Sequence, residues 1–505
     1  MKKVSGIFDK FLNIVEKGGN ALPNPSTLFA IFAFLTIMLS GIAYLLDLQS
    51  IHPVTNEIIK INNLLSEWGL HKIMLEMVDN FTSFAPLGIV MVALLGLGIA
   101  EGSGLISTVI RLFVLSAPKS MLTFIIVFAG VISNMASTVG YVILIPLAGV
   151  VFLAVRRHPI AGMAAAYAGI SGGYNANLLI GTVDPLLAGL SQEAARIIDP
   201  AYVVNPTANY YFMFISTFLI SIAGTWITEK FVEPRLGNYS GEVEPEKIEH
   251  LSPEEKKGLK FTLITISAIV IAIFIGMFPE DGIFRGDDGT ILGSPLIKGV
   301  VSLIFVVAGL AGIAFGFGTG KFKNDDDVIK SMEQSMKSIA TYLVLVFFAS
   351  QFVAYFNWTN LGLIIAIEGA NFLAHLGIEL IPLMILFIIL SGTINLFMGS
   401  ASAKWALMAP IFVPMFMLLG FSPELTQTGF RIGDSVTNVI SPMMSFFALI
   451  IVFFQKYDKK AGIGTIVSTM LPYSILFFIF WTILLVFWIW MGFPLGPNSG
   501  LHYQM

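Results

Sequence analysis

Eleven long apolar runs constrain this chain more than any other feature of its sequence. They fall at residues 27–48, 84–115, 120–155, 159–190, 207–228, 259–278, 296–318, 338–376, 380–420, 424–454 and 466–492. With 56% hydrophobic residues, 12% charged residues and a mean hydropathy of +0.84, the chain carries more apolar surface than a soluble core can bury. We therefore expect a multi-pass membrane protein whose solvent is the lipid bilayer.

Two of the runs are too long for one crossing and have small and polar residues at their centres. A membrane-spanning helix needs about 20 residues, so the runs at 120–155 and 380–420 are interpreted as re-entrant hairpins. Nine crossings remain. The sequence predicts an all-α polytopic membrane protein with about nine transmembrane helices and two opposed hairpins, arranged as an inverted repeat.

The distribution of Lys and Arg predicts the orientation, because basic residues are retained on the cytoplasmic side during insertion. A cytoplasmic N-terminus and an outer C-terminus put 21 of the 28 basic residues on the inner side and leave five outside, with Lys404 and Arg431 inside membrane segments. The expected divisions are an N-terminal segment (1–26), a first half (27–228), a cytoplasmic linker (229–258), a scaffold part (259–337), a second half (338–492) and an outer tail (493–505).

Composition excludes several classes of function. A net charge of −4 with no long basic tract argues against nucleic-acid binding, and the absence of Cys excludes disulfides and thiolate metal sites. No nucleotide-binding motif is present, so ATP-driven pumping is disfavoured. No cofactor is expected, and an ion gradient, of protons or of sodium, is the remaining energy source.

A faint internal repeat supports the inverted arrangement. A shift of 264 positions places Thr138 on Ser402 and Tyr141 on Trp405, and a shift of 257 places Asn177 on Asp434. Inverted-repeat transporters place their binding site at mid-membrane, where helices are broken. The repeat therefore favours a secondary transporter over a channel.

The segment from Ser171 to Pro185 is the first candidate for a broken helix. It contains paired glycines, Asn175, Asn177 and an Asp184-Pro185 step, so we expect it to unwind midway. Its polar residues are either helix caps in an interfacial loop or part of a binding site. An ionisable residue within a span favours the second interpretation.

The second candidate runs from Phe430 to Pro442. Arg431 and Asp434 are three positions apart and share a helix face, which predicts that they pair with each other. The pair is either a structural salt bridge or a site in which Arg431 binds a substrate carboxylate. Asp434 is then its partner, a proton site or a cation ligand, with Asn438 one turn further on.

The hairpin tips supply the third set of candidates. Ser133, Asn134, Ser137 and Thr138 lie at the first tip, and the second tip carries Asn395, Ser400, Ser402, Lys404 and Trp405. Their hydroxyls either cap helices or contact the solute. Trp405 offers a flat face to an aromatic ligand or anchors the chain at the membrane interface. Glu101 is expected where the second span breaks.

Four long motifs resemble the p-aminobenzoyl-glutamate transporter (AbgT) family, and the likeness covers nearly the whole chain. They lie at residues 177–189, 399–406, 409–415 and 431–445. The resemblance implies a bacterial inner-membrane homodimer with nine spans and two hairpins. It also implies that the family's inner pathway corresponds to Asp184, Asn395, Ser402, Trp405, Pro423, Arg431, Asp434 and Pro442.

The same resemblance implies the cargo. Family members take up p-aminobenzoyl-glutamate or export sulfonamide antimetabolites with protons, and both solutes contain a p-aminophenyl ring. The expected function is thus ion-coupled uptake of an aromatic amide, with efflux as the alternative and a passive channel less favoured. The tip around Asn134 differs from the Ser-Asn-Thr tip of dicarboxylate relatives, so a sodium ion is placed only near Asn134, Asp184 or Asp434. An enzyme is not expected.

Overall fold

The structure is a computed structural model that describes residues 23–51, 56–136, 140–241, 243, 251–279, 281–286, 289–291 and 294–503. Most of the expected N-terminal segment, part of the 229–258 linker, and the tip residues Ser137 and Thr138 lie outside these ranges.

The described chain is almost entirely helical, as the sequence predicts. Eight of its helices are long and apolar enough to cross a membrane. Seven of them are continuous spans: α2 (Pro25–Leu45), α4 (Ala85–Ser103), α10 (Tyr210–Ile227), α12 (Pro253–Met277), α14 (Val300–Thr319), α16 (Ala340–Trp358) and α22 (Ile463–Met491). The eighth, α19 (Ala401–Leu418), is an arm of a hairpin.

Two further spans are broken near their middles, which completes nine crossings. The first consists of α8 (Pro159–Tyr167), a π-helical turn to Gly172, an irregular segment at 173–182, and α9 (Val183–Ala195). The second consists of α20 (Pro423–Asn438), an irregular segment at 439–446, and α21 (Phe447–Gln455). Lipid cannot satisfy irregular backbone, so both breaks must be buried in protein or line a polar cavity.

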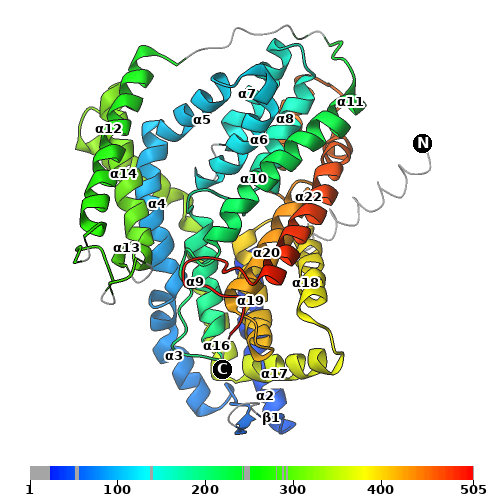
Figure 1. Cartoon of the computed structure of the whole chain (residues 1–505). Helices are drawn as coiled ribbons and strands as arrows, with labels where there is room; N and C mark the ends of the chain where they lie inside the picture. Colours follow the sequence, from blue (N-terminus) through cyan, green and yellow to red (C-terminus); the bar gives the residue numbers. More distant parts are fainter. Residues whose placement is uncertain are drawn as a thin grey trace.

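The two hairpins enter the molecule from opposite ends (Figure 1). Hairpin 1 is formed by α6 (Leu122–Ser133) and α7 (Ile145–Ala154), and hairpin 2 by α18 (Leu380–Asn395) and α19. In Figure 1 the arms of hairpin 1 come from the top and those of hairpin 2 from the bottom, and Tyr141 of the first and Ser400 and Ser402 of the second line one cavity. This is the inverted arrangement expected from the sequence.

Two apolar runs are divided differently from the prediction. The run at 84–115 ends its helix at Gly104, whose φ of 91° is left-handed, and α5 (Leu105–Leu115) forms a bend of 113° with the following segment into hairpin 1. The run at 338–376 breaks at Asn360, with φ 60°, between α16 and α17 (Leu361–His375). A residue in the left-handed backbone conformation ends a helix. A break at one such residue within an apolar run is hard to predict from the sequence.

The remaining elements are short or peripheral. They are α3 (Glu67–Thr82), α11 (Glu233–Leu236), α13 (Pro295–Lys298), α15 (Asp325–Ser338), and the antiparallel strand pair β1 (Gln49–Ile51) and β2 (Ile58–Lys60). The strand pair was not predicted. The chain after α22 turns back over the start of α20, where Ser422 N donates to Leu501 O at 3.0 Å.

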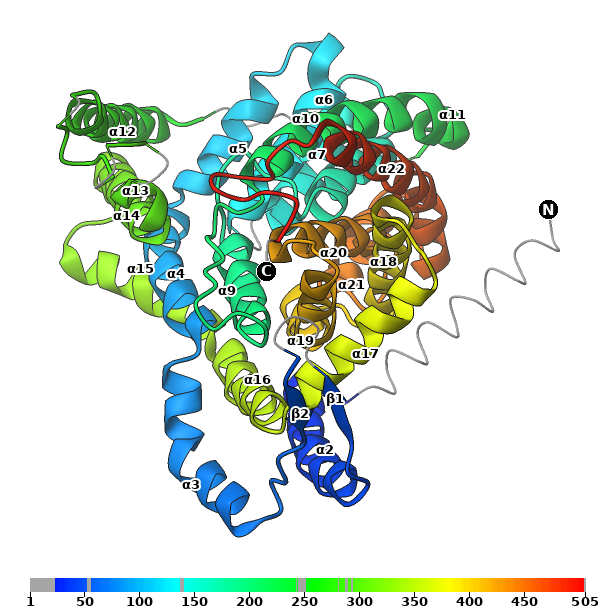
Figure 2. The same ribbon diagram turned by 60° about the horizontal axis from the view of Figure 1, so that its bottom comes forward.

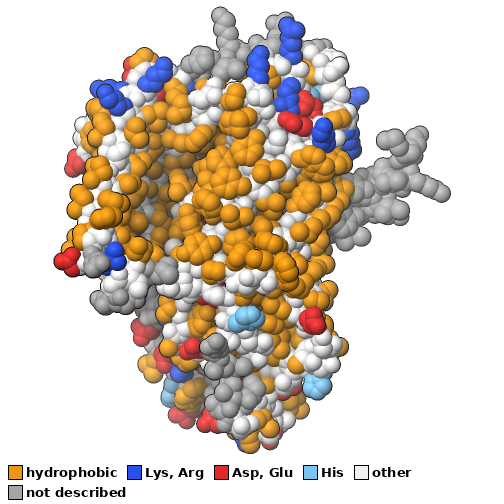
Figure 3. Space-filling model, viewed as in Figure 1, with side chains coloured by type: hydrophobic (Ala, Val, Ile, Leu, Met, Phe, Trp, Pro, Cys, Tyr) orange, Lys and Arg blue, Asp and Glu red, His pale blue; other side chains and the backbone are white. Residues whose placement is uncertain are grey.

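The helices separate into a peripheral group and a central group. Figure 2 shows α12 and α14 beside α4 on one side, with α18–α22 on the other. Apolar side chains cover a broad band of the surface, and Lys and Arg gather at the end where α12 begins (Figure 3). The hairpins and broken spans lie in the central group, where most large side chains are buried.

Candidate transport site

Helix α20 is polar in sequence and yet is almost completely buried beside hairpin 2. Fifteen of its sixteen residues are buried, including Glu424, Gln427, Arg431 and Asp434. These four residues recur every three or four positions and therefore follow one face of the helix. Burying ionisable groups is costly unless they are paired and hydrogen-bonded, so each must have a partner.

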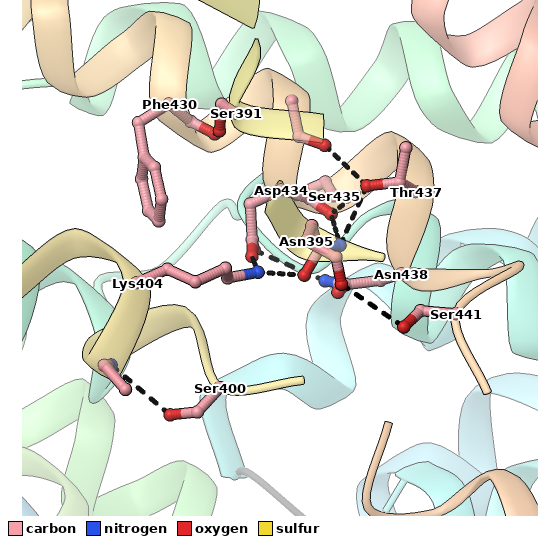
Figure 4. Close-up of polar contacts among 12 residues, drawn as sticks. Ser391, Asn395, Ser400, Lys404, Phe430, Asp434, Ser435, Thr437, Asn438 and Ser441 are labelled. Atoms are coloured by element: carbon pink, nitrogen blue, oxygen red, sulfur yellow. Dashed lines mark hydrogen bonds and ion pairs between the residues drawn. The ribbon is translucent and has the colours of Figure 1, made fainter. Parts of the chain in front are cut away.

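Asp434 pairs with Lys404 of α19 (Figure 4). Both side chains are fully buried, and the Lys404 ammonium donates to Asp434 Oδ1 and to Asn395 Oδ1. The other carboxylate oxygen, Oδ2, accepts from Asn175 Nδ2 at 2.8 Å and from Asn438 Nδ2 at 3.3 Å. The Lys404 ammonium and both Asp434 carboxylate oxygens thus have hydrogen-bond partners within the protein.

Asn395, the last residue of α18, holds the tip of hairpin 2 against α20. Its Nδ2 donates to Asp434 O at 2.7 Å and to Thr437 Oγ1 and Asn438 Oδ1, both at 2.8 Å. Ser441 Oγ donates to the Asn395 carbonyl at 3.3 Å. A single residue therefore connects the hairpin, the end of α20 and the irregular segment that follows it, through its side-chain amide and its backbone carbonyl.

Arg431 pairs with Asp184, and the predicted Arg431–Asp434 pair is wrong. Arg431 Nη2 lies 2.8 Å from Asp184 Oδ1, with the two side chains 3% and 4% exposed. Asp184 Oδ2 accepts from the Gly181 backbone N at 2.7 Å. Sequence spacing placed Arg431 and Asp434 on one face, but α9 and α19 pack against that face and each supplies a partner of opposite charge.

A chain of neutral hydrogen bonds continues along α20 toward Glu424. Ser191 of α9 receives a hydrogen bond from Trp405 Nε1 at 2.9 Å and donates to Gln427 Oε1 at 2.6 Å. Gln427 Nε2 donates to Asn209 Oδ1 at 2.6 Å. Trp405 is fully buried and packs against Phe430, with ring centroids 4.6 Å apart and planes tilted by 31°. Its ring is therefore part of the packing between α19 and α20.

A cavity of about 240 Å³ lies where the hairpins and the broken spans meet. Its polar lining includes Ser400 and Ser402 from hairpin 2, Asn438 from α20 and Tyr174 from the first irregular segment. Its aromatic lining is the stacked pair Tyr141 and Phe446, with centroids 4.5 Å apart and planes at 11°. The cavity touches the Lys404–Asp434 pair through Asn438, which bonds Asp434.

The tip of hairpin 1 contacts the first broken span. Ser133 Oγ donates to Gly130 O at 2.7 Å, and Asn134 Nδ2 donates to Ile170 O at 2.9 Å. The Oδ1 atoms of Asn134, Asn175 and Asn177 are buried without a hydrogen-bond partner in the part of the chain that the structure describes. These amide oxygens can coordinate a cation or accept a hydrogen bond.

The remaining predicted residues have structural positions. Pro423 is in the first turn of α20, and Pro442 lies in the irregular segment after it. The structure brings Asp184, Asn395, Arg431, Asp434 and Asn438 into one bonded cluster, with Ser402 in the cavity wall. Trp405 contacts α9 through Ser191 and does not line the cavity.

Sequence reasoning missed the aromatic wall of the cavity and most of the outer hydrogen-bond chain. Tyr141, Tyr174 and Phe446 were not singled out, because single aromatic residues in apolar runs are usually packing residues. Gln427 could have been found, since it shares the three-and-four spacing of Arg431 and Asp434.

Comparison with known proteins identifies the family. The AbgT transporter family profile matches residues 10–503. The chain belongs to the AbgT family. This AbgT protein is 36% identical over 490 residues to the p-aminobenzoyl-glutamate transport protein of Escherichia coli K12, covering 97% of this chain and 96% of the relative.

Two solved transporter structures share its fold over nearly the whole chain. The Alcanivorax borkumensis YdaH transporter matches with a TM-score of 0.91 and 45% identity, covering 94% of this chain and all of that one. Neisseria gonorrhoeae MtrF, described as one of a class of antimetabolite efflux pumps, matches with a TM-score of 0.91 and 48% identity, covering 97% and 100%. The AbgT protein is thus a multi-pass membrane transporter of a small molecule, and not an enzyme.

Proposed function

We propose that this protein is an ion-gradient-coupled secondary transporter that takes up p-aminobenzoyl-glutamate or a related aromatic amide. The observation that carries the proposal is the cavity between the two hairpin tips, which joins a stacked aromatic wall to hydroxyl and amide groups. A p-aminophenyl ring suits the Tyr141–Phe446 wall, since aromatic rings favour offset stacking. The name of the Escherichia coli relative supports this cargo.

The polar end of the cargo would meet the cluster beside the cavity. Ser402 and Asn438 line the cavity and can bond an amide or a carboxylate. We assign the transport pathway to these two residues and to Asn177, Asp184, Asn395, Trp405, Pro423, Arg431, Asp434 and Pro442. The two buried ion pairs set the charge of this pathway, while the prolines and Trp405 position its helices.

The coupling ion is a proton or sodium. The pathway holds two buried carboxylates, Asp434 and Asp184, as acidic groups for a coupling proton. Sodium prefers oxygen ligands, and the unbonded Oδ1 atoms of Asn134 and Asn177 beside the first irregular segment fit that preference.

The same proposal includes location and assembly. The concentration of Lys and Arg at one end of the molecule supports a cytoplasmic N-terminus and an outer C-terminus in a bacterial inner membrane (Figure 3). We propose a homodimer, in keeping with the family resemblance.

A second candidate function is proton-driven efflux of sulfonamide antimetabolites. The observation that favours it is the 48% identity to MtrF, which is described as an antimetabolite efflux pump. A sulfonamide carries the same p-aminophenyl ring, so the aromatic wall suits both cargoes. The two candidates differ in the direction of net flux.

Flux into proteoliposomes tests both candidates. Vesicles containing the purified protein receive labelled p-aminobenzoyl-glutamate or a labelled sulfonamide under an imposed proton or sodium gradient of either direction. Accumulation of the first solute supports uptake, and accumulation of the second against its gradient supports efflux. Equal flux with protein-free vesicles for both solutes would overturn the proposal, and currents far above carrier turnover would indicate a channel.

A further inference from the structure

A second cavity, of about 270 Å³, adjoins the cavity between the hairpins. The two cavities share three lining residues, Gly399 and Ser400 of hairpin 2 and Ser445 of the second irregular segment. Consecutive residues of that segment line different cavities, since Met444 lines the first and Met443 lines the second. The hairpin tip and this segment therefore form a partition between the two spaces.

The partition is tightest at Gly399. A Cβ built at this position would collide with Met443 O, so the hairpin tip meets the backbone of the irregular segment at a residue without a side chain. Beside this contact, Ser400 and Ser445 line both cavities. Their hydroxyl groups can donate and accept hydrogen bonds. A solute that extends past the partition therefore meets hydroxyl groups at its middle and a cavity at either end.

The far wall of the second cavity is the start of α2. Pro23, Asn24, Pro25 and Leu28 line it. Asn24 caps the helix, with its Oδ1 accepting from Ser26 N at 2.9 Å, and Pro25 occupies the first helical position. The cap and the proline fix where α2 begins, which sets the position of Leu28 in the cavity wall.

The two sides of the second cavity belong to differently packed parts of the chain. Helix α2 packs on α16, where the rings of Phe29 and Phe32 lie 6.0 and 5.8 Å from that of Phe352. The opposite side consists of the hairpin 2 tip and the segment after α20. A substitution on α2 can therefore change the second cavity without altering the first.

The second cavity is largely apolar and, among the residues that the structure describes, no charged side chain lines it. Phe397, Met398 and Met443 supply much of its surface. Methionine side chains adapt to the shape of a ligand and contact aromatic rings favourably, as phenylalanine rings do. An ionised carboxylate would lose its water here without gaining a cation. The lining therefore suits an uncharged apolar or aromatic group.

We propose that the second cavity is a further subsite for the cargo, which takes an uncharged apolar or aromatic substituent on the amide nitrogen. This inference rests on the proposed function, because it places the p-aminophenyl ring at the Tyr141–Phe446 wall of the first cavity. The amide then lies at the partition beside Ser400 and Ser445. Its substituent extends past the hairpin tip into the space in front of α2.

The subsite widens the class of cargo. The charged end of p-aminobenzoyl-glutamate stays in the first cavity beside Ser402 and Asn438, whereas an apolar end enters the second cavity, between Leu28 and Phe397. An N-substituted p-aminobenzamide with an apolar second end thus fills both cavities. Leu28 and Phe397 become specificity-determining residues that do not contact the p-aminophenyl ring.

Binding of two related amides tests the subsite. p-Aminobenzamide has only the ring and the amide, and N-benzyl-p-aminobenzamide adds one apolar ring on the amide nitrogen. Isothermal titration of the purified full-length protein in detergent gives the Kd of each. For the wild-type protein we expect the benzyl compound to bind about 10-fold more tightly, because its second ring leaves water for an apolar cavity.

Four variants locate the added ring. Leu28→Trp fills the second cavity from α2, and Phe397→Ala removes its aromatic side, so both should reduce the advantage of the benzyl compound and leave the Kd of p-aminobenzamide unchanged. Phe446→Leu alters the first cavity and should weaken both amides by the same factor. Leu39→Trp is the matched control for Leu28→Trp, because Leu39 is a 51% exposed residue of α2 that lines neither cavity. Size-exclusion chromatography reports folding.

Equal Kd values of the wild-type protein for the two amides would overturn the subsite, and flux of labelled p-aminobenzoyl-glutamate would then leave the proposed function standing. Folded Leu28→Trp and Phe397→Ala proteins that keep the full advantage of the benzyl compound would also refute the subsite, since the second ring would lie elsewhere. If Leu28→Trp does not fold, Phe397→Ala decides alone. Absence of flux together with absence of binding by both amides would instead refute the proposed function, and the inference that rests on it.

Discussion

Arg431 and Asp184 form an ion pair that joins the two halves of the chain across 247 positions, with Nη2 and Oδ1 2.8 Å apart. Asp184 starts the helix after the first break, and Arg431 lies in the helix before the second. The pair therefore holds α9 and α20 together beside both irregular segments. Neither side chain has appreciable contact with solvent.

Removing one member of this pair should destabilise the protein strongly. Arg431→Met leaves Asp184 buried without its cation, and breaking a buried pair costs about 3–5 kcal/mol. The double change Arg431→Met with Asp184→Leu should recover much of that loss, because no charge remains unpaired. Thermal unfolding in detergent measures both.

The Lys72–Glu76 pair, which is partly exposed, provides the control for that cycle. Lys72→Met breaks the Lys72–Glu76 contact, and exposed pairs contribute only about 0–1 kcal/mol. If Arg431→Met unfolds no earlier than Lys72→Met, Asp184 is not buried as the structure has it. Both Arg431 variants should lose transport, since the pathway charge is altered in each.

The ring of Trp405 should affect stability more than solute affinity. Trp405→Phe removes the indole N–H that donates to Ser191 and should cost about 1 kcal/mol. Trp405→Ala also empties the contact with Phe430 and should cost about 3–5 kcal/mol. Thermal unfolding measures these losses of stability, and the KM for transport measures the effect of each variant on solute affinity. A large rise in KM for Trp405→Phe with unchanged stability would place the ring in contact with the solute.

The aromatic wall of the cavity should set affinity for the p-aminophenyl ring. Phe446→Leu keeps an apolar side chain but removes the ring stacked on Tyr141. Aromatic contacts contribute about 0.5–1.5 kcal/mol, so the KM should rise by about 2- to 10-fold. Phe372→Leu, on the exposed face of α17, is the matched control. Equal KM values for the two variants would show that the Tyr141–Phe446 wall is not part of the solute-binding site.

The spans and hairpins were predictable from sequence because the bilayer imposes a length on every apolar run. Both breaks were predictable too, since the paired glycines Gly172 and Gly173 and the Ser441-Pro442 step do not favour a continuous helix. The partners of the charges were not predictable. Spacing along one helix suggested Arg431 with Asp434, but the ions pair across helices, and which helices pack together is a property of the folded chain.

Lys404 shows the same limitation. In sequence it stands beside Trp405, a combination typical of the membrane interface, where a lysine can reach water. In the structure its ammonium is fully buried against Asp434.

His158 should make stability depend on pH at the end of the molecule where Lys and Arg gather. It caps α8, and its Nδ1 accepts from Ile160 N at 3.3 Å. Burial lowers the pKa of His158 below its usual value, opposed by the carboxylates of Glu233 and Asp458. The unfolded chain then binds the proton more readily, so this contribution to stability is present above about pH 6.5 and is lost as pH falls below it.

His158→Asn tests this pH dependence because Asn caps a helix without titrating. The melting temperature of the variant should fall less than that of wild type between neutral and mildly acidic pH. Parallel curves for the two proteins would show that His158 carries none of the dependence.

Gly169, in the π-helical turn after α8, faces α6 of hairpin 1, and Gly433 of α20 faces α18 of hairpin 2; both should be equally intolerant of a side chain. At Gly169 and Gly433 an added Cβ meets a backbone oxygen of the facing hairpin arm, and backbone cannot move aside as a flexible side chain can. Gly169→Ala and Gly433→Ala should each destabilise the protein by about 1–3 kcal/mol, the usual cost of overpacking. Gly88→Ala is the matched control, because it lies in α4 with no atom within 4 Å of the added Cβ, and alanine there should stabilise the helix by about 0.5–1 kcal/mol. Thermal unfolding of the three variants measures these changes in stability. If Gly433→Ala is destabilised and Gly169→Ala behaves as Gly88→Ala, the two halves do not pack their hairpins against the broken spans in the same way.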